Sequence, residues 1–600
     1  MKTIGLIFVS CVAALKGETF VVTSIADEGA GSLREAISLA NGTAAIDLIV
    51  FSGGEEGSIN FSDGVPRVIQ IASTLSVTQS LEIVGPGKTL LAIDGGGDGD
   101  FLVESGEVRV FSFAGSTVAE PHRVTDLTIR NGTSILGGAN IRVFGSLELV
   151  RCEISGGRGV AANPSVNGNT TENADGGGVF HSQGPMLVEA CEIFENGTIG
   201  NFSQGGGLYS ENGSLTIRGS RIFSNTTNGA VSEGGGLGLR STTVLEDSEV
   251  SDNETLASSS GGGGVYTDDE FLARNTTFSG NVVGAATGMQ GYSVGGAFAS
   301  VGFGDAAFEA CTIVDNRAPS GTGQGGGIST FSRGQISFFS TILIGNDAVD
   351  LERIPNAITR FIDRGYNLFG IGSGFDLIED RQGTSFYGVS SDEGILDVLD
   401  FYGGPTRSHR LSIGGSNTID FGPPRSIYEE ETGEAALFDQ RGADFPRSSG
   451  ERLDVGAYEF QTFLDRDNDG LPDAVEEIVE GLNPDLPDAE LDLDGDGIRN
   501  HDEYVQLGIL AINDRERFLR PSISSLTGFE EVQLNFQTSP NREYRLRFGE
   551  GLSEELMTEQ TDFLRFLGES KGAITIPVSE ERMFFRVESR IPEELLDNSL

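Results

Sequence analysis

The feature that most constrains this chain is a short pattern that recurs six times between Gly176 and Asn346. Each unit opens on a glycine-rich run followed by an apolar residue, and the runs begin at Gly176, Gly205, Gly234, Gly262, Gly295 and Gly325. The period is about 29 residues, a length typical of solenoids. In a solenoid each unit buries its apolar face only against its neighbours, so the units must stack.

Three further positions recur in every unit, each of one residue type. A small residue is found at Cys191, Ser220, Ser248, Thr276, Cys311 and Ser340. An apolar residue follows two positions later, at Ile193, Ile222, Val250, Phe278, Ile313 and Ile342. An asparagine closes the pattern, at Asn196, Asn225, Asn253, Asn281, Asn316 and Asn346.

The repeat is best explained by short strands. The units lack the leucine framework of a leucine-rich repeat, and their glycines would break the helices of an ankyrin array. Alternating apolar residues such as Leu215 and Ile217, followed after a bend by Ser220 and Ile222, predict strand, bend, strand. Stacked coils would place like residues about 4.8 Å apart. The asparagine amides could then bond their own backbone and the next asparagine, and glycines would supply corners with positive φ. The sequence therefore predicts an all-β, right-handed parallel β-helix.

A column of charge accompanies the repeat. Residues of alternating sign stand two places before the small residue, at Glu189, Arg218, Glu246, Arg274 and Glu309. Stacking would turn them into a ladder of ion pairs on the outer surface. The column could be a charged binding stripe or a solvated edge that sets register. Because exposed pairs contribute little free energy, we favour the second interpretation.

The N-terminal end of the array needs a cover, since a β-helix otherwise exposes apolar groups and unpaired strand edges. Ser32 and Glu35 have the spacing of a capping box, which predicts a short helix over Ser32–Leu39. Strands such as Val68–Ala72, Leu81–Val84 and Leu127–Ile129 predict early, irregular coils.

These motifs resemble those of known bacterial proteins. The Gly-Gly-x-Ile…Ile-x-x-Asn units resemble the repeats of polymorphic outer-membrane proteins and of the wider pectate-lyase-like β-helix superfamily. Ser32–Ile37 resembles the SLREAI sequence that opens many large secreted β-helix proteins. The succession Thr406–Leu411, Asp439–Gly442 and Asp454–Phe460 resembles the C-terminal end of the family called choice-of-anchor Q. The resemblance implies a secreted β-helix and leaves activity open.

Two acidic loops predict calcium sites. The first matches all the slots of a twelve-residue EF-hand loop with Asp465, Asp467, Asp469, Leu471, Asp473 and Glu476. The second does so with Asp492, Asp494, Asp496, Ile498, Asn500 and Glu503. Ca²⁺ takes six to eight oxygen ligands, and alternate residues of such a loop point inward, with position 7 giving its backbone carbonyl. The alternative is an acidic linker that binds no ion.

The pair of loops resembles the thrombospondin type 3-like calcium repeats of bacterial surface proteins, or dockerins. Residues Tyr458–Phe463 predict a strand where a full EF-hand would have its first helix. Ca²⁺ is therefore the expected cofactor, with a structural role at the millimolar concentrations found outside cells.

The chain divides into six predicted segments. They are a signal peptide over 1–17, an N-terminal cap with the first coils over 18–135, regular repeats over 136–350, C-terminal coils over 351–460, tandem calcium loops over 461–512 and a small β-sandwich over 515–600. The sandwich is predicted from apolar runs at Val532–Phe536, Tyr544–Phe548, Ala573–Val578 and Met583–Val587.

The signal peptide follows from a charge at Lys2 and a short apolar core over Ile4–Leu15. Phe8–Cys11 resembles a lipoprotein box, so lipidation of Cys11 is the alternative to its removal with the signal. Cys152, Cys191 and Cys311 fall on small-residue positions, which predicts buried, inert thiols. A Cys152–Cys191 bridge between adjacent coils is the alternative in an oxidising compartment.

The formal net charge of −49 argues against a nucleic-acid partner, because phosphates need basic neutralisation. After the signal, no apolar run approaches the length of a membrane span. We therefore expect a secreted or cell-surface protein.

Two classes of function fit these features. One is a non-catalytic scaffold for adhesion, display or glycan binding, with an extracellular polysaccharide or a cell-surface component as partner. The other is a polysaccharide lyase or hydrolase acting on an acidic polymer such as pectate, since many relatives of the fold cleave such polymers. The nearest candidate cluster for an enzyme is Asp247, Glu249, Asp252, Asp268, Asp269 and Glu270, with Arg240 and Arg274. His409, Asp439 and Arg441 are a further candidate, for which we favour a structural role. The Gly-His-Gly and Arg-Ile-Lys motifs of polygalacturonases do not occur, and we favour the scaffold.

Overall fold

The protein is described here from a computed structural model. It covers residues 17–101, 104, 106–161, 173–229, 231–256, 260–284, 293–318, 323–347, 349–353, 359–373, 377–379, 381, 383–389, 394–412, 418–447, 452–461, 466–467, 469–471, 473–476, 479, 481–491, 493 and 499–501, and the strands given below between residues 522 and 590. Residues 1–16, which hold most of the predicted signal peptide and Cys11, lie outside this range. The chain forms two compact units, one of Met1–Ser448 with Arg452–Glu459 and the other of Ser449–Glu451 with Phe460–Leu600.

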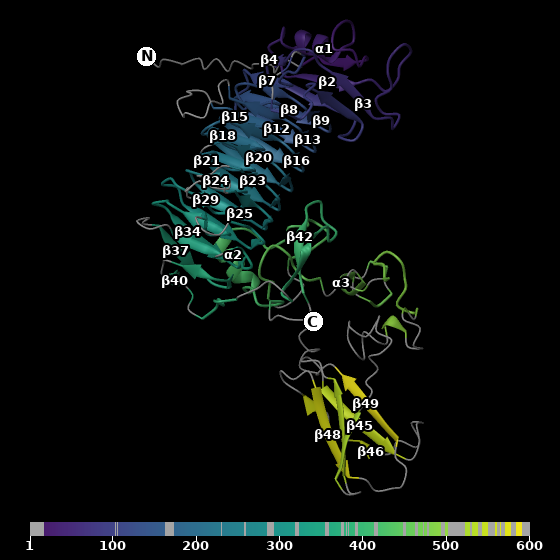
Figure 1. Ribbon diagram of the computed structural model, residues 1–600. Coiled ribbons are helices and arrows are strands. Elements are labelled where there is room, and N and C mark those ends of the chain that lie inside the picture. Colours follow the sequence, from purple (N-terminus) through teal and green to yellow (C-terminus); the bar gives the residue numbers. More distant parts are fainter. Residues whose placement is uncertain are drawn as a thin grey trace, which may run out of the picture. The chain divides into compact units, whose positions relative to one another are not determined.

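The first unit is a parallel β-helix, whose coils stack one on the next in Figure 1. Its largest sheet contains β1 (Thr19–Val22), β2 (Asp47–Phe51), β4 (Leu75–Val77), β5 (Leu81–Val84), β7 (Phe111–Ala114), β8 (His122–Thr125), β11 (Ile141–Phe144), β12 (Leu147–Val150), β15 (Val179–Glu189), β18 (Leu208–Arg218), β21 (Leu237–Glu246), β24 (Val265–Thr267), β25 (Phe271–Arg274), β29 (Phe298–Ser300), β30 (Ala306–Glu309), β33 (Ile328–Thr330), β34 (Gln335–Phe339), β36 (Leu351–Arg353), β37 (Arg360–Asp363), β39 (Gly372–Ser373) and β40 (Leu377–Glu379).

The other faces of the coils form smaller parallel sheets. One contains β3 (Arg67–Gln70), β6 (Leu91–Asp94), β9 (Thr128–Arg130), β13 (Glu153–Ser155), β16 (Glu192–Phe194), β19 (Arg221–Phe223), β22 (Glu249–Ser251), β26 (Thr277–Ser279), β31 (Thr312–Val314), β35 (Ile342–Leu343) and β38 (Leu368–Phe369). Another contains β10 (Thr133–Ser134), β14 (Arg158–Val160), β17 (Gly197–Ile199), β20 (Thr226–Asn228), β23 (Glu254–Thr255) and β27 (Val282–Val283). The short strands β28 (Ser293–Val294) and β32 (Gly323–Gln324) pair with each other. The predicted parallel β-helix is confirmed.

The register follows the sequence repeat except in the sixth unit. Ile193 pairs with Ile222, and Ile222 with Val250, as the repeat predicts. Ile313, however, pairs with Leu343, and the backbone N–H of Cys311 donates to Thr341 Oγ1 at 3.3 Å. The small and apolar positions of this unit are therefore Thr341 and Leu343, and the predicted Ser340 and Ile342 were each wrong by one residue. The reason is that Ser340 takes the left-handed bend, with φ of 51°, that Ala310 takes in the coil before it.

A continuous ladder of buried asparagines joins the coils. The Nδ2 of Asn196, Asn225, Asn253, Asn281 and Asn316 each donates to the Oδ1 of the next asparagine, at 2.8 to 3.1 Å. The same oxygens accept a backbone N–H from the preceding coil. The ladder ends at Asn346, whose Nδ2 donates to Asp350 Oδ1 at 2.8 Å. Each amide thus satisfies buried groups that would otherwise be costly to desolvate, which confirms the predicted role of the asparagines.

The glycine runs serve two different purposes. Gly205, the first of its run, has a φ of 65°, a conformation that favours glycine. A side chain on Gly206 would lie 2.3 Å from the carbonyl oxygen of Gly235, so this glycine is required for close stacking. Other corners use left-handed residues that are not glycine, such as Ala190 and Asp247, with φ of 52° and 50°. The predicted glycine corner is therefore one of several, and inter-coil contacts must offset the strain of the others.

The core is one continuous column of apolar side chains from Val22 to Phe369. At its N-terminal end lies α1 (Leu33–Ala40), where the Oγ of Ser32 accepts the backbone N–H of Glu35 at 3.2 Å. The buried side chains of Leu33 and Ile37 join the core. The predicted capping helix is confirmed.

The predicted charge ladder is present from Arg218 to Glu309 and continues beyond the repeats, whereas no ion pair joins Glu189 to Arg218 among the described residues. Arg274 contacts Glu246 at 3.1 Å and Glu309 at 2.8 Å, and Arg364 contacts Glu309 at 2.7 Å. Arg218 pairs with Glu246 at 3.0 Å on a more exposed part of the surface. Arg274 and Glu309 are buried, at 8% and 5% exposure, so this half of the ladder is not the solvated edge that the sequence indicated.

The cover over that half is a segment that returns along the β-helix and contacts Arg274 and Arg364 through Thr432 and Glu431; we call it the return segment (residues 396–412, 418–447 and 452–459). It contains an antiparallel pair, β41 (Leu396–Asp400) and β42 (Ser408–Leu411), and α2 (Arg425–Thr432). The predicted C-terminal coils of 351–460 thus reach β40 within the described residues, and from Leu396 the chain takes a different path. Arg407 binds Glu249, and Gln440 accepts a hydrogen bond from Thr277 Oγ1 at 2.6 Å.

The candidate triad His409, Asp439 and Arg441 has structural partners. His409 bonds Ser279 Oγ through Nε2 and the carbonyl oxygen of Asp397 through Nδ1. Arg441 donates to both carboxylate oxygens of Asp439 and to the carbonyl oxygen of Glu459. Its guanidinium carbon also lies 3.9 Å from the ring centre of Phe445 and 3.8 Å from that of Tyr458. These contacts fix the return segment, as the structural interpretation predicts.

The three cysteines within the coils are free and buried. The Sγ of Cys191 accepts the backbone N–H of Cys152 at 3.3 Å, so the two thiols occupy the same position of adjacent coils. Burial raises the pKa of Cys311 to about 12, which keeps this thiol protonated. The prediction of buried thiols is confirmed.

The second unit contains the short helix α3 (Asp473–Glu476) and, further on, two antiparallel sheets. Their strands are β43 (Ser522–Thr527), β44 (Glu531–Gln537), β45 (Glu543–Gly549), β46 (Glu559–Gln560), β47 (Leu564–Arg565), β48 (Lys571–Pro577) and β49 (Phe584–Arg590). The four strands predicted for a β-sandwich correspond to β44, β45, β48 and β49. The strand predicted from Tyr458 is wrong over residues 458–461, which are irregular.

In the part of the chain that the structure describes, no helix has the length and apolarity needed to cross a membrane.

The asparagine ladder yields a stability prediction. Replacing Asn253 by Ala removes the acceptor of Asn225 and the donor to the carbonyl oxygen of Ile222. We expect this variant to lose about 2–4 kcal/mol of unfolding free energy, because several buried groups lose their partners. Urea unfolding followed by circular dichroism measures the loss. Asn228→Ala, at a half-buried position of the preceding coil, is the matched control, and an equal loss in both variants would contradict the role of the ladder.

The contact of the return segment with Glu249 predicts a pH dependence. Burial raises the pKa of Glu249, but hydrogen bonds from Arg407 and Arg221 outweigh burial and hold the pKa below its usual value of 4.5. A carboxylate with a lowered folded-state pKa stabilises the fold above its unfolded pKa and loses that effect as the pH falls through the folded pKa. Glu249→Gln should therefore cost about 3 kcal/mol at pH 7, and the difference from the unsubstituted protein should shrink below pH 4.5.

Unfolding free energies of both proteins between neutral and acidic pH test this expectation. The exposed Glu270→Gln variant is the control and should be nearly neutral at every pH. A difference for Glu249→Gln that stays constant into acid would contradict the ion-pair explanation.

Candidate functional site

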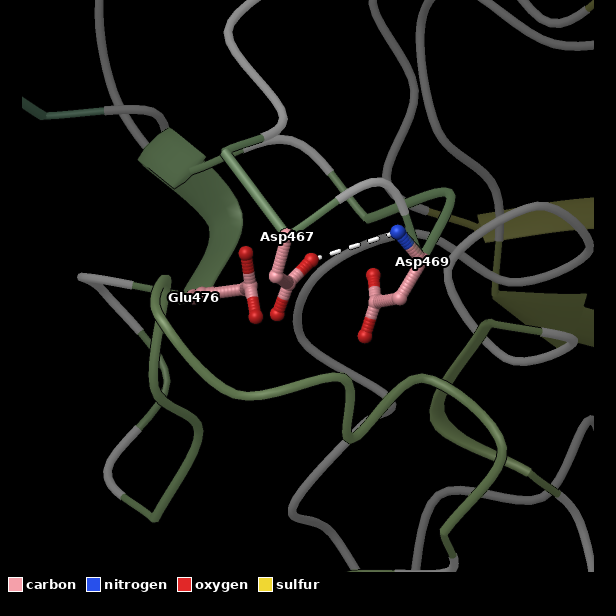
Figure 2. Close-up of side chains that lie close together, drawn as sticks. All are labelled: Asp467, Asp469 and Glu476. Carbon is pink, nitrogen blue, oxygen red and sulfur yellow. Dashed lines mark hydrogen bonds between the residues drawn. The ribbon is translucent and has the colours of Figure 1, made fainter.

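Three carboxylates converge in the first predicted calcium loop. Asp467, Asp469 and Glu476 each offer an oxygen, and these oxygens lie within 4.8 Å of one another. Figure 2 shows the side chains of Asp467 and Glu476 side by side, with Asp469 facing them from the turn of the loop. The two aspartates belong to the loop, and the glutamate closes α3, as the loop pattern predicts.

The backbone of the loop explains the convergence. The Oδ1 of Asp467 accepts the N–H of Asp469 at 3.2 Å, and the Oδ1 of Asp469 accepts the N–H of Leu471 at 2.9 Å. Such side-chain turns curl the chain around its own carboxylates. Gly470 has a φ of 97°, which the sharp turn at loop position 6 requires. Leu471 anchors the loop from behind, because its side chain is buried against Val475, Val479 and Ala489.

The donor set suits a hard divalent cation. Glu476 is only 1% exposed, so its carboxylate has little water to offset the neighbouring negative charges. Converging carboxylate oxygens are the ligands that Ca²⁺ prefers. The residues present therefore fit the ion that the loop pattern predicts.

The other predicted ligands are only partly described. The structure describes the backbone of Asp473 in α3 but not its side chain, and Asp465, Asp492, Asp494, Asp496, Ile498 and Glu503 lie outside the described residues. Asn500 is fully buried, where its Oδ1 accepts the N–H of Leu493 at 2.9 Å and its Nδ2 donates to the carbonyl oxygen of Asp488 at 2.8 Å. The ligand roles of Leu471 and Asn500, and the second site as a whole, stay predictions.

One acidic residue beside the first loop was not predicted from the sequence. Asp488 belongs to the connector between the loops, outside the twelve-residue pattern. Burial raises its pKa, the N–H of Asn483 opposes the rise, and the carboxylate of Asp469 adds to it. The adjacent N–H of Ala489 donates to Asp469 Oδ2 at 2.6 Å, which holds the connector against the loop.

The acidic cluster proposed for a lyase is not one site. Arg240 lies 3.5 Å from Asp268, whereas Arg274 belongs to the charge ladder with Glu246 and Glu309. Arg407 of the return segment binds both Glu249 and Asp252. Asp247 accepts a hydrogen bond from Asn275 Nδ2 at 3.2 Å. These side chains therefore serve separate contacts along the coils.

A second acidic group was also missed. Asp175, Gln204 and Glu233 each precede a glycine run and stack in three successive coils. The backbone N–H of Gln204 donates to Asp175 Oδ1 at 2.8 Å, and its Nε2 donates to Glu233 Oε2 at 2.6 Å. Burial raises the pKa of Asp175 to about 7 and that of Glu233 to about 7. The sequence signal for this group was the polar residue that precedes the glycine run. It is weak, because the residue at that position is polar in only some of the units.

Comparison of the chain with models of known protein families and with curated proteins found no match.

Proposed function

We propose that this protein is a secreted or cell-surface, calcium-binding β-helix scaffold that presents its coils to an extracellular polysaccharide or a cell-surface component without catalysing a reaction. The observation that carries the proposal is the convergence of Asp467, Asp469 and Glu476 in a loop with the EF-hand spacing. In this proposal Ca²⁺ orders the acidic loops, and the β-helix supplies a repetitive surface.

The contacts of the coils also favour a scaffold. Five charged side chains of the lyase-like set, those of Arg240, Glu249, Asp252, Asp268 and Arg274, are held in ion pairs that connect coils or fix the return segment. Side chains engaged in this way stiffen a solenoid, since each pair joins neighbouring units. We also propose that the protein is an adhesin and that its acidic loops are thrombospondin type 3-like calcium repeats.

Calcium binding is tested on the full chain after removal of divalent ions with a chelator. With a dissociation constant of about 10⁻⁴–10⁻³ M, a site at about 10 mM Ca²⁺ should stabilise its unit by about 1.4–2.7 kcal/mol. We expect slower amide exchange over residues 466–501 and heat release on titration. Mg²⁺ should act more weakly, because it demands a smaller, octahedral site.

The variant Asp467→Asn with Glu476→Gln should lose this binding at the first loop. Asp485→Asn is the matched control, because its side chain is exposed and lies 3.4 Å from Arg466 in a weak surface pair. Unchanged amide exchange of the unsubstituted protein over the whole calcium range would refute the proposal.

One observation favours a polysaccharide hydrolase as a second candidate. Asp175 and Glu233 occupy equivalent positions two coils apart, which corresponds to about 9–10 Å at the spacing of neighbouring strands. Inverting glycosidases hold their acid and base about 6.5–9.5 Å apart, and a raised pKa suits the acid. Tyr209 and Tyr266, both largely buried, flank this group, and Arg240 lies near it.

Incubation of the calcium-loaded protein with polygalacturonate or alginate discriminates between the two candidates. A hydrolase would release reducing ends, and Glu233→Gln would abolish the release because it removes the acid. A lyase would instead produce an unsaturated product that absorbs in the ultraviolet. We expect neither product, and Glu233→Gln-sensitive release of reducing ends would reverse the ranking.

A further inference from the structure

An open groove crosses five successive coils on the outer face of the largest sheet. It is formed by β21, β25, β30, β34 and β37, which pair in that order, and has a volume of about 540 Å³. Volumes of this size are typical of ligand sites. Five stacked strands span about 19 Å, whereas the three residues that line the groove in each of the first coils span only about 7 Å along a strand. The groove is therefore elongated across the coils, as a bound linear polymer would be.

The floor of the groove is one column of outward-pointing side chains. It consists of Val244, Leu272, Ala307, Ser337 and Ile362, each paired in register with the next. All five are half-buried, and their neighbours along each strand are buried in the core, as alternation in a strand requires. Ala307 and Ser337 are smaller than the residues on either side of them. The floor is therefore a mostly apolar strip with a hollow over β30 and β34.

One rim of the groove carries exposed polar side chains, each two residues before the floor residue of its coil. They are Thr242, Glu270, Asp305 and Gln335. Among the described residues, the hydroxyl of Thr242, the carboxylate of Glu270 and the side-chain amide of Gln335 have no hydrogen-bond or ion-pair partner. Asp305 uses one oxygen, because its Oδ1 accepts the N–H of Gln335 at 2.7 Å. The rim thus offers a row of donors and acceptors that the protein itself does not use.

Charge determines which polymers this groove can accept. Among the described residues that line it, Arg364 is the one basic side chain, and it contacts Glu309 at 2.7 Å and Glu431 at 3.1 Å. Arg360, which pairs in register with Gln335, lies outside this lining. A polyanion would therefore meet the two carboxylates of the rim, in a chain of net charge −49, without an unpaired cation in the lining. A neutral polymer meets no such repulsion.

We propose that this groove binds a neutral, extended polysaccharide. The sugar rings lie with their apolar faces on the floor, and their hydroxyl groups bond the rim, where Glu270 and Asp305 accept hydrogen bonds and Gln335 can both accept and donate. The inference rests on the proposed scaffold function and narrows its partner to an uncharged polysaccharide. None of the lining residues belongs to the acidic loops or to the group around Glu233.

Isothermal titration of the full, calcium-loaded chain tests the class of ligand. The probes are the pentaoses of the cello-, xylo-, manno- and laminari-series, with a galacturonate pentamer as the acidic comparison. We expect at least one neutral pentaose to bind. Its disaccharide should bind at least tenfold more weakly, because it covers only part of the floor, and the galacturonate pentamer should also bind at least tenfold more weakly. Failure of every neutral pentaose to bind, or tighter binding of the galacturonate, overturns the proposal.

Two variants test whether the ligand lies in the groove. Ala307→Phe fills the hollow from the outer face and should abolish binding, whereas Leu187→Phe, in the same column two coils before the groove, should not. Glu270→Ala with Gln335→Ala removes rim groups that have no partner in the protein and should weaken binding at least tenfold. Ser214→Ala, in the rim column one coil before the groove, is its control. Unchanged affinity in both groove variants would place the ligand elsewhere.

A labelling experiment avoids the bulky substitution. Cys152, Cys191 and Cys311 are buried, so a thiol reagent should modify only a cysteine introduced on the outer face. The neutral pentaose that binds should slow the modification of Ala307→Cys at least tenfold and leave that of Leu187→Cys unchanged. Equal rates for Ala307→Cys with and without the pentaose contradict the proposed site.

The outcomes separate this inference from the proposal on which it rests. If Ca²⁺ binds at the first acidic loop but no neutral pentaose protects Ala307→Cys, the groove is no glycan site and the calcium-binding scaffold stands without it. If a neutral pentaose binds in the groove of a chain that binds no Ca²⁺, the inference stands and the calcium part of the proposed function fails.

Discussion

The asparagine ladder is the interaction on which the rest of the β-helix depends. A parallel coil can slide along its neighbour by two residues and still pair its backbone, but the ladder permits only one register, because each amide must meet the next amide and a fixed carbonyl oxygen. Once the asparagines align, the small residues, apolar residues and charges align with them. The ladder also has a defined end, where Asp350 accepts the last Nδ2. Register in this protein is therefore set by buried polar groups and not by the apolar core alone.

The same stacking determines how a strongly acidic chain can fold. With 89 acidic residues against 40 basic ones, pairing one to one would leave 49 acidic side chains without a basic partner. In the coils, arginines alternate with glutamates so that one guanidinium contacts two carboxylates, as Arg274 does with Glu246 and Glu309. In the acidic segment of residues 466–501, the negative charges are not balanced by an arginine ladder. There Asp467, Asp469 and Glu476 converge on one another, and in the proposed function a divalent cation neutralises them.

Repetition made much of the fold predictable from the sequence, and the exceptions show why the rest was not. The strands, the asparagine ladder and the alternating charges follow from a pattern that is read many times over. The one-residue error at Ser340 arose because the bend before the small residue can take a left-handed alanine, serine or aspartate, so composition does not mark it. The return segment was missed as a cover because it occurs once, and its contacts, such as Arg407 with Glu249, join residues more than 150 positions apart. In the first acidic loop, the spacing predicted the three carboxylates that converge, but not the contact of the Ala489 N–H with Asp469, which joins residues 20 positions apart through the folding of the connector.

Chemically distinct groups in this fold lie at positions that depart from the repeat. In a perfect column each side chain is packed by copies of itself above and below, which leaves no room for a group with different surroundings. Gly238 breaks such a column, because it stacks between Tyr209 and Tyr266. A side chain there would lie 2.9 Å from the Cβ of Gln204, so the missing ring makes room for the amide that bonds Glu233. The acidic loops depart further from the repeat, since they come after the coils in the sequence and form a single pair. A β-helix therefore carries its distinctive groups at interruptions and ends, while the regular coils between them supply rigidity.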